Sequence, residues 1–233
     1  MSGPLSHIRV LDLSRVLAGP WAAQNLADLG AQVIKVERPI KGDDSRAFAP
    51  PYLMDQEGKS TKESAYYCAA NRGKRSITIN ISNAEGQKLV RELATEVDVI
   101  VENYKVGDLA RYGLGYEDIK AINPGIIYCS ISGFGQDGPY APRAGYDLMI
   151  QAMSGMMSIT GRGDGEPGGG PQRVGVALTD IFTGVYAATA ILAALEVRHR
   201  TGEGQHIGLG HDGRYVDLFP GQLFVAQHQP HFF

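Results

Sequence analysis

Residues 8–37 read IRVLDLSRVLAGPWAAQNLADLGAQVIKVE and contain two short hydrophobic runs on either side of a helical pattern. The runs at 8–13 and 32–37 are rich in Val, Ile and Leu, as β-strands are. Between them, residues 21–29 have the apolar spacing of a helix, and Gly30 supplies a stop signal. The stretch therefore predicts a β-α-β unit.

The same alternation returns further along the chain. Residues 76–81, 97–102 and 125–131 are strand-like, residues 83–96 form an amphipathic helical pattern, and 109–112 and 116–122 predict short helices. The stretches 39–62 and 161–171 are rich in Gly, Pro and charged residues and predict loops. Alternating strands and helices predict an α/β fold that is Rossmann-like, with a mostly parallel sheet flanked by helices.

Composition describes a globular chain of one or two domains: 233 residues, 43% hydrophobic and 20% charged. Its net charge of -3 predicts no nucleic-acid or membrane partner. Cys68 and Cys129 lack metal or redox spacing, and the N-terminus lacks a targeting pattern, so we expect a cytoplasmic protein. The apolar run at 181–197 has about 17 residues, fewer than a membrane span needs, and predicts a buried helix.

In such a sheet, ligands bind beyond the carboxyl ends of the strands. The densest positive cluster is Asn-Arg-Gly-Lys-Arg-Ser at 71–76, either a solvated turn or a site for several phosphates. Glu37 ends a predicted strand where a dinucleotide-binding fold holds a ribose, so an NAD-type site is another alternative. The Gly-x-Gly-x-x-Gly fingerprint of that site is absent from the loop after the first strand.

Asp180 is a lone acid at the start of the apolar run 181–197. An Asp at this position either caps a helix, by accepting its free backbone N–H groups, or acts as a nucleophile. The positive end of the helix dipole favours a carboxylate in both roles. The local sequence leaves the two interpretations open.

Seven motifs, in order along the chain, identify a family resemblance that covers residues 4–207. They are residues 10–20 (VLDLSRVLAGP), 26–39 (LADLGAQVIKVERP), 71–76 (NRGKRS), 98–104 (DVIVENY), 132–139 (SGFGQDGP), 144–147 (AGYD) and 175–180 (GVALTD). On these motifs the chain resembles the class III coenzyme A transferases, which include formyl-CoA transferase, carnitine CoA-transferase and α-methylacyl-CoA racemase.

The resemblance implies that Asp180 is the nucleophile. It would attack an acyl-CoA to form a mixed anhydride and then an aspartyl-CoA thioester, moving CoA from a succinyl-CoA-like donor to a free carboxylic acid. It implies no metal and no tightly bound cofactor, because the CoA thioester is itself the substrate. The CoA-binding residues implied by the resemblance are Leu17, Ala18, Arg38, Arg72, Gly73, Lys74, Arg75, Asn103, Lys105 and Arg111.

Two alternatives to transfer remain. Racemases of the family carry His where this chain has Tyr146, a neighbouring active-site residue whose phenol titrates too high to serve as a neutral-pH base. Transfer is therefore favoured over racemisation. The other alternative is an inactive CoA-binding fragment.

The resemblance also predicts the domain organisation. Residues 1–200 are expected to form a CoA-binding Rossmann-like large domain. Residues 201–233 are expected to begin an inter-domain linker and continue as an atypical tail that departs from the family pattern after Ile207. A smaller domain is expected to be missing, and the full-length protein to be an interlocked homodimer. His228 and His231 in the tail do not have the spacing of a metal site.

Overall fold

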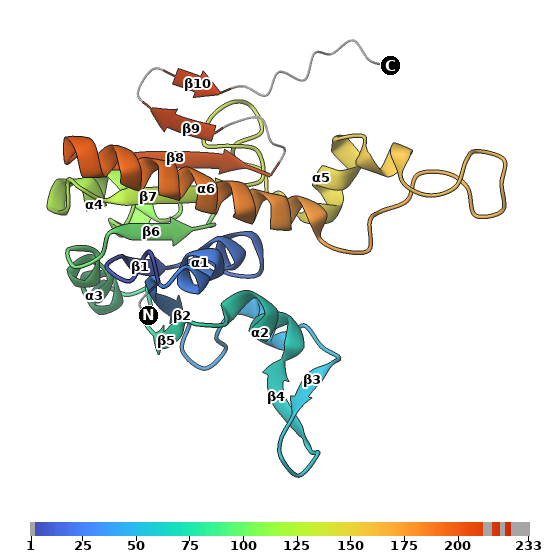
Figure 1. Ribbon diagram of the computed structural model, residues 1–233, viewed down its shortest axis with the longest axis horizontal. Helices are drawn as coiled ribbons and strands as arrows, with labels where there is room; N and C mark the ends of the chain where they lie inside the picture. The colour runs from blue at the N-terminus through green and yellow to red at the C-terminus, as the bar shows by residue number, and fades with distance from the viewer. Residues whose placement is uncertain (1–2, 212–215, 220–221, 225–233) are drawn as a thin grey trace.

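The computed structural model describes residues 3–211, 216–219 and 222–224, and its centre is an eight-stranded sheet ordered β10-β9-β8-β7-β6-β1-β2-β5 (Figure 1). Six neighbouring strands are parallel, and β9 and β10 extend the sheet antiparallel. The expected α/β fold with a mostly parallel sheet is confirmed. The strands are β1 (Arg9–Asp12), β2 (Gln32–Glu37), β5 (Arg75–Thr78), β6 (Val99–Glu102), β7 (Ile127–Ser132), β8 (Gln205–Gly210), β9 (Val216–Phe219) and β10 (Gln222–Phe224).

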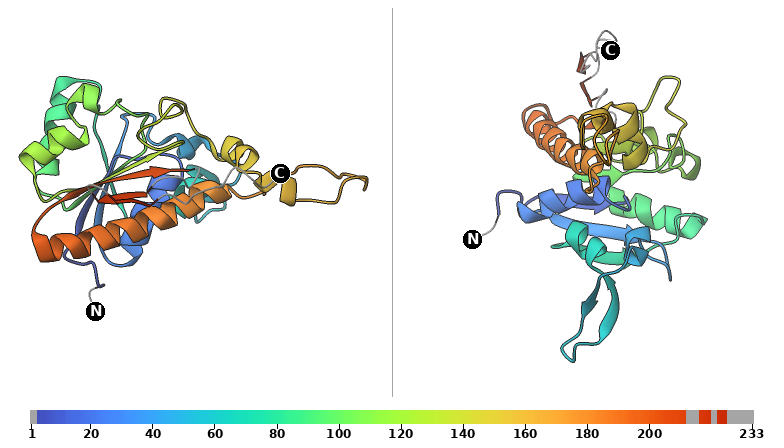
Figure 2. Two further views of the ribbon diagram at one scale, coloured as in Figure 1. Left: turned by 90° about the horizontal axis from the view of Figure 1, so that it is seen from above. Right: turned by 90° about the vertical axis from the view of Figure 1, so that its right-hand side faces the viewer.

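Helices cover both faces of this sheet (Figure 2). Helices α1 (Ala18–Asp28) and α6 (Leu178–Thr201) lie on one face, and α3 (Ala84–Ala94) and α4 (Tyr116–Ile122) lie on the other. Successive residues of a strand point to opposite faces, so Val10 packs in the core under α1 and α6 while Leu11 packs in the core under α3 and α4. Both faces are buried, which explains the continuous apolar runs of the sequence.

The strand order reverses direction between β1 and β6. From β1 the chain builds outward through β2 to β5, then returns to the other side of β1 and builds outward through β6, β7 and β8. At such a switch point the loops that leave neighbouring strands diverge, and the crevice between them is where open α/β sheets bind ligands. Residues 13–17 and 103–107 therefore flank the expected ligand crevice.

The predicted loop 39–62 contains regular structure. It holds a 3₁₀ turn, η1 (Asp44–Ala47), and a hairpin of β3 (Tyr52–Met54) and β4 (Ser60–Ser64) that projects from the body (Figure 1). Asp55 closes the hairpin, because its Oδ1 accepts the N–H groups of Glu57 and Lys59. The exposed hairpin has no apolar alternation by which its strands could be recognised.

The sequence pattern predicts only one of four further short elements, the turn within residues 109–112. Helix α2 (Ala65–Asn71) follows the hairpin, and α5 (Asp147–Met153) precedes the second predicted loop; η2 (Ala110–Tyr112) and η3 (Met156–Ile159) are short 3₁₀ turns. Residues 161–171 contain one isolated bridge and otherwise form the loop expected from their Gly content.

Helix α6 is longer than the expected 181–197. By length and composition alone it could cross a membrane, but half of its most apolar window is buried inside the protein. Ala187 and Ile191 pack in the core against the sheet and α1, as a buried helix requires.

The range 201–233, expected to be a linker and tail, contributes to the main sheet. Strand β8 pairs in register with β7 from Gln205 to Gly210. This strand places the end of the sheet beyond residue 200, the expected limit of the large domain. The division into two domains stays a prediction.

We predict that Gly184→Ala destabilises the protein. A Cβ at Gly184 in α6 would lie 2.7 Å from the backbone oxygen of Ala18 in α1. Overpacking of this kind costs about 1–3 kcal/mol, which outweighs the gain of up to about 1 kcal/mol in helix propensity. Urea unfolding should therefore give a lower free energy of unfolding than the wild type.

The matched control is Glu196→Gln at an exposed position of the same helix. It should change the free energy of unfolding by less than about 0.5 kcal/mol. A Gly184→Ala protein as stable as the wild type would contradict the close approach of α1 and α6.

Candidate active site

A cavity of about 290 Å3 opens at the switch point. The loops that follow β1, β6 and β7, the end of β8 and the first turn of α6 all line it. Chain segments far apart in sequence thus converge on one crevice, as the strand order predicts. Six of the sequence-predicted site residues line this cavity: Leu17, Ala18, Asn103, Lys105, Tyr146 and Asp180.

Asp180 lies in the first turn of α6 but does not cap it. The cap is Asp147, whose Oδ1 accepts the N–H groups of Thr179 at 2.8 Å and Asp180 at 3.4 Å and the Thr179 hydroxyl at 2.6 Å. The capping interpretation of Asp180 is therefore wrong for this structure. Because another carboxylate takes the capping role, the side chain of Asp180 is left to face the cavity.

The electrostatic setting of Asp180 raises its pKa to about 7. Burial is the larger cause, because it penalises the charged carboxylate, and the neighbouring charge of Asp147 adds to it. A carboxylate that is partly protonated at neutral pH is a better nucleophile once ionised than an ordinary, well-solvated Asp. Perturbed acids of this kind in a cleft are candidates for chemistry.

His211 is a site residue that sequence analysis did not identify. Its Nδ1 lies 3.5 Å from Oδ1 of Asp180 and 3.1 Å from the hydroxyl oxygen of Thr183. Burial lowers the pKa of His211 to about 4, so the imidazole is neutral near pH 7. The contact with Asp180 therefore joins a neutral imidazole to an acid, and is not a full ion pair at that pH.

Several predicted CoA-binding cations lie outside the cavity lining. Arg38 pairs with Asp44, which does line the cavity, so its guanidinium is at the rim. Arg72 binds Asp28 at the end of α1, at 2.5 and 3.1 Å. Arg111 binds Asp108 at 2.6 Å on the surface, and Arg75 is exposed on β5.

Two residues of the cationic cluster at 71–76 have structural roles: Lys74 forms buried hydrogen bonds and Gly73 turns the chain. Lys74 is buried, and its ammonium donates to Asp12, to the carbonyl of Pro20 and to Asn71 at 2.7–2.8 Å. It was expected beside phosphates, but its three donors are all occupied by these contacts. Gly73 has φ 75°, a left-handed conformation that glycine adopts without strain, and it turns the chain between α2 and β5.

Glu37 does not offer a ribose site. Its carboxylate accepts two bonds from Arg46 at 2.7 and 2.8 Å and one each from Tyr67, Ser76 and the N–H of Asp43. Burial alone would raise its pKa, but these donors lower it to about 2. The NAD-type alternative depended on Glu37, and the carboxylate of Glu37 is occupied by these protein donors.

Three further polar residues in the cavity escaped sequence analysis as individual site residues: Arg15, Arg143 and Asp147. The order of motifs pointed to residues 144–147 as a group, yet nothing in the local sequence distinguished Asp147 as the cap of a helix that begins thirty residues later. Within residues 3–211, 216–219 and 222–224, no group of His, Cys, Asp and Glu could hold a metal ion. His228 and His231 lie outside the described residues.

The chain matches the family model described as CoA-transferase family III over residues 5–223, so the match continues past Ile207. It is similar to the succinate–glutarate CoA-transferase of Agrobacterium fabrum, with 57% identity over 88% of this chain and 50% of that protein. It is also similar to the succinyl-CoA:glutarate CoA-transferase of Mus musculus, with 54% identity over 88% of this chain and 44% of that protein.

Among solved structures, the chain is similar to a CAIB/BAIF family protein from Brucella suis. The TM-score is 0.84 and the identity 54%, over 91% of this chain and 54% of that chain. The chain spans about half the length of the curated relatives it matches.

We predict that Asp147→Asn lowers the pKa of Asp180 below about 7. The asparagine oxygen can still accept the helix N–H groups, while its amide replaces Oδ2, which accepts from Nε2 of Gln151 at 2.6 Å. The cap then remains at the cost of the bond to Gln151, and the neighbouring negative charge disappears. Asp180 should then be more fully ionised at pH 7 than in the wild type. The measurement is a ¹³C NMR titration of the Asp180 carboxyl carbon.

Asp164→Asn, in the exposed loop 161–171, is the matched control and should leave the titration unchanged. An unchanged or higher pKa of Asp180 in Asp147→Asn would contradict the assigned electrostatic coupling.

Proposed function

The chain belongs to CoA-transferase family III, and on this premise we propose that it transfers coenzyme A from an acyl-CoA to a free carboxylic acid. The observation that carries the proposal is the position of Asp180. It lines a cavity at the switch point of the sheet, together with Leu17, Ala18, Asn103 and Lys105. A nucleophile and a set of small and polar groups thus share one crevice.

The proposed reaction begins at the carboxylate of Asp180. One of its oxygens attacks the thioester carbonyl carbon of the donor, the C–S bond breaks, and CoA leaves as a thiolate. The product is a mixed anhydride between Asp180 and the donor acid. The thiolate then attacks the carboxyl carbon of Asp180, the donor acid leaves, and an aspartyl-CoA thioester remains.

The acceptor acid repeats these steps in reverse. Its carboxylate attacks the aspartyl thioester, releases the thiolate and forms a second mixed anhydride. The thiolate then attacks the acyl carbon of the acceptor, which leaves as its CoA ester and frees Asp180. The N-terminus of α6 favours the oxyanions that form at Asp180, because the positive end of the helix dipole lies there.

We propose succinyl-CoA as donor and a dicarboxylic acid as acceptor, as the names of the similar proteins from Agrobacterium fabrum and Mus musculus suggest. Lys105 and Arg143 line the cavity, and among the described residues neither forms an ion pair. Their charges are available to phosphates of CoA or to the second carboxylate of such an acid. No tightly bound cofactor is required for this reaction.

Racemisation is less well supported. A proton-transferring pair must hold the substrate carbon between its two members, but His211 and Asp180 are only 3.5 Å apart and leave no room for a carbon. Tyr146, which stands where racemases of the family carry the basic His, is exposed at the cavity.

We also propose that the full-length protein is an interlocked homodimer in the cytoplasm. Support comes from large apolar side chains exposed along α6, which a monomer would leave in water. These are Phe182, Val185, Tyr186 and Leu192. The two cysteines are free, as in a reducing compartment.

We predict that Asp180→Asn abolishes covalent chemistry and preserves CoA binding. Mixing the wild-type chain with succinyl-CoA should give a succinyl-sized or CoA-sized mass increase on the intact protein, and the variant should show none. Because the variant keeps the shape of the side chain, its dissociation constant for CoA should stay within about threefold of the wild type.

Glu196→Gln, exposed near the other end of α6, is the control and should be labelled like the wild type. A wild-type chain without any adduct would contradict the transferase proposal and favour the CoA-binding fragment. Loss of CoA binding in Asp180→Asn would contradict the role given to Asp180.

A further inference from the structure

Val16 has a backbone conformation that valine seldom adopts. Its φ is 69°, in the left-handed region, where a β-branched side chain crowds the neighbouring peptide. The residue is half-buried and lines the cavity, between β1 and the first residue of α1. Strain of this kind persists only where the surroundings hold it, and it concentrates at functional sites.

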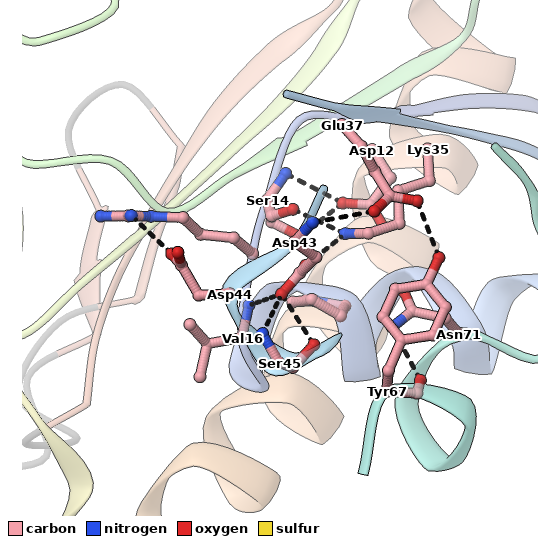
Figure 3. Close-up of polar contacts among 12 residues, drawn as sticks. Asp12, Ser14, Val16, Lys35, Glu37, Asp43, Asp44, Ser45, Tyr67 and Asn71 are labelled. Atoms are coloured by element: carbon pink, nitrogen blue, oxygen red, sulfur yellow. Dashed lines mark hydrogen bonds and ion pairs between the residues drawn. The ribbon is translucent and has the colours of Figure 1, made fainter. Parts of the chain in front are cut away.

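The surroundings that hold Val16 come from a different loop. Oδ1 of Asp43 accepts the N–H of Val16 at 3.1 Å and also the N–H and hydroxyl of Ser45 (Figure 3). Oδ2 of Asp43 pairs with the ammonium of Lys35 at 2.9 Å. The same ammonium donates to the carbonyl of Ser14 at 2.8 Å. Asp43 and Lys35 therefore fix the backbone on both sides of Arg15.

Asn103 holds the backbone of Arg15, which lies between Ser14 and Val16. Its side-chain oxygen accepts the N–H of Arg15 at 2.8 Å, and its amide donates to the carbonyl of Arg15 at 2.7 Å. The turn at 14–16 is thus held by Lys35 of strand β2 and by Asp43 and Asn103 of two other loops. Lys35 and Asp43 are 1% and 4% exposed and do not line the cavity, so they reach a ligand only through this backbone.

The turn is coupled to the nucleophile through helix packing. The left-handed residue directs the chain into α1, and the carbonyl of Ala18 then lies against Gly184 of α6. Gly184 is one helical turn beyond Asp180 and on the same face of the helix. The position of the 16–18 backbone therefore determines what lies beside Asp180 in the cavity.

We propose that the buried Lys35–Asp43 pair is a positioning element, which holds Val16 in its left-handed conformation and so places the backbone of residues 16–18 opposite Asp180. This inference rests on the proposed function for its role in acyl transfer, and on geometry alone for its role in holding the turn.

Asp43→Asn is the variant that tests it. An asparagine has one acceptor oxygen for two groups of donors, Lys35 on one side and Val16 with Ser45 on the other. In either orientation of the asparagine side chain, its NH₂ group faces a donor, which is Lys35 in one orientation and the N–H groups of Val16 and Ser45 in the other. The turn loses either its bond to Val16 or the charge that orders Lys35. We expect the maximal rate of adduct formation at Asp180 with saturating succinyl-CoA to fall about tenfold.

Val16→Gly supplies the rescue. Glycine adopts φ near 69° without a side-chain penalty, so a turn that contains it depends less on the hydrogen bond from residue 16 to Asp43. The double variant Val16→Gly with Asp43→Asn should be labelled within about threefold of the rate of Val16→Gly alone. All rates are measured under conditions where urea unfolding shows each variant to be folded, so the recovery reports the turn and not a general gain in stability.

The matched control is Asp55→Asn in the β3–β4 hairpin, which does not line the cavity. Like Asp43, Asp55 accepts backbone N–H groups in a turn. It should be labelled at the wild-type rate. A normal labelling rate in Asp43→Asn, or a double variant as slow as Asp43→Asn alone, would overturn the proposal.

Hydrogen exchange of the Val16 amide tests the holding contact without any chemistry. We expect this amide to exchange at least about a hundredfold more slowly than in a free peptide. Exchange at the free-peptide rate would overturn the proposal, even if Asp43→Asn cannot be folded. If the wild type shows the protected amide but no adduct with succinyl-CoA, the proposed function fails and the positioning of the turn stands.

Discussion

The structure depends on a carboxylate that is fully buried at the end of β1. Asp12 binds the ammonium of Lys74 at 2.7 Å, lies 3.9 Å from that of Lys35, and accepts the N–H of Ser14 at 3.0 Å. Burial opposes the charge of Asp12, yet the two lysines hold its pKa below the ordinary value. Removing one partner from such a group leaves an uncompensated buried charge and costs about 3–5 kcal/mol.

This charged cluster explains why the candidate site is where it is. Asp12 joins β1 to the turn before β5 through Lys74, and Lys35 joins β2 to the loop that carries Asp43. The loops that follow β1 and β2, on one side of the switch point, are thereby attached to the sheet that positions them. Two other acids, Asp147 and Asp180, line the cavity, where Asp147 caps α6 and adds to the raised pKa of Asp180. Charged side chains in the interior thus order the backbone, and the charge of Asp147 in the cavity adds to the raised pKa of Asp180.

Much of the fold follows from local patterns. Continuous apolar runs became the buried parallel strands, and the helical period at residues 83–96 became α3, because the spacing of apolar residues reports the faces that must be buried. The β3–β4 hairpin was missed because it is exposed and held by the side chain of Asp55. The short helix α5 was missed because its main partner, the N-terminus of α6, is distant in sequence.

The candidate site divides in the same way. Motif order and residue chemistry were enough to select Asp180, Tyr146, Asn103 and the turn at Leu17 and Ala18, because these lie at the ends of strands or the start of a helix that the sequence predicts. They were not enough for most of the cations, since a cation is attracted both to a phosphate and to a nearby carboxylate. Lys74, Arg72 and Arg111 found carboxylates within the fold. Only the tertiary structure could decide this competition, and only it could bring Asp43 to Val16 or His211 to Asp180, because such contacts depend on how distant loops approach and not on the residues beside them.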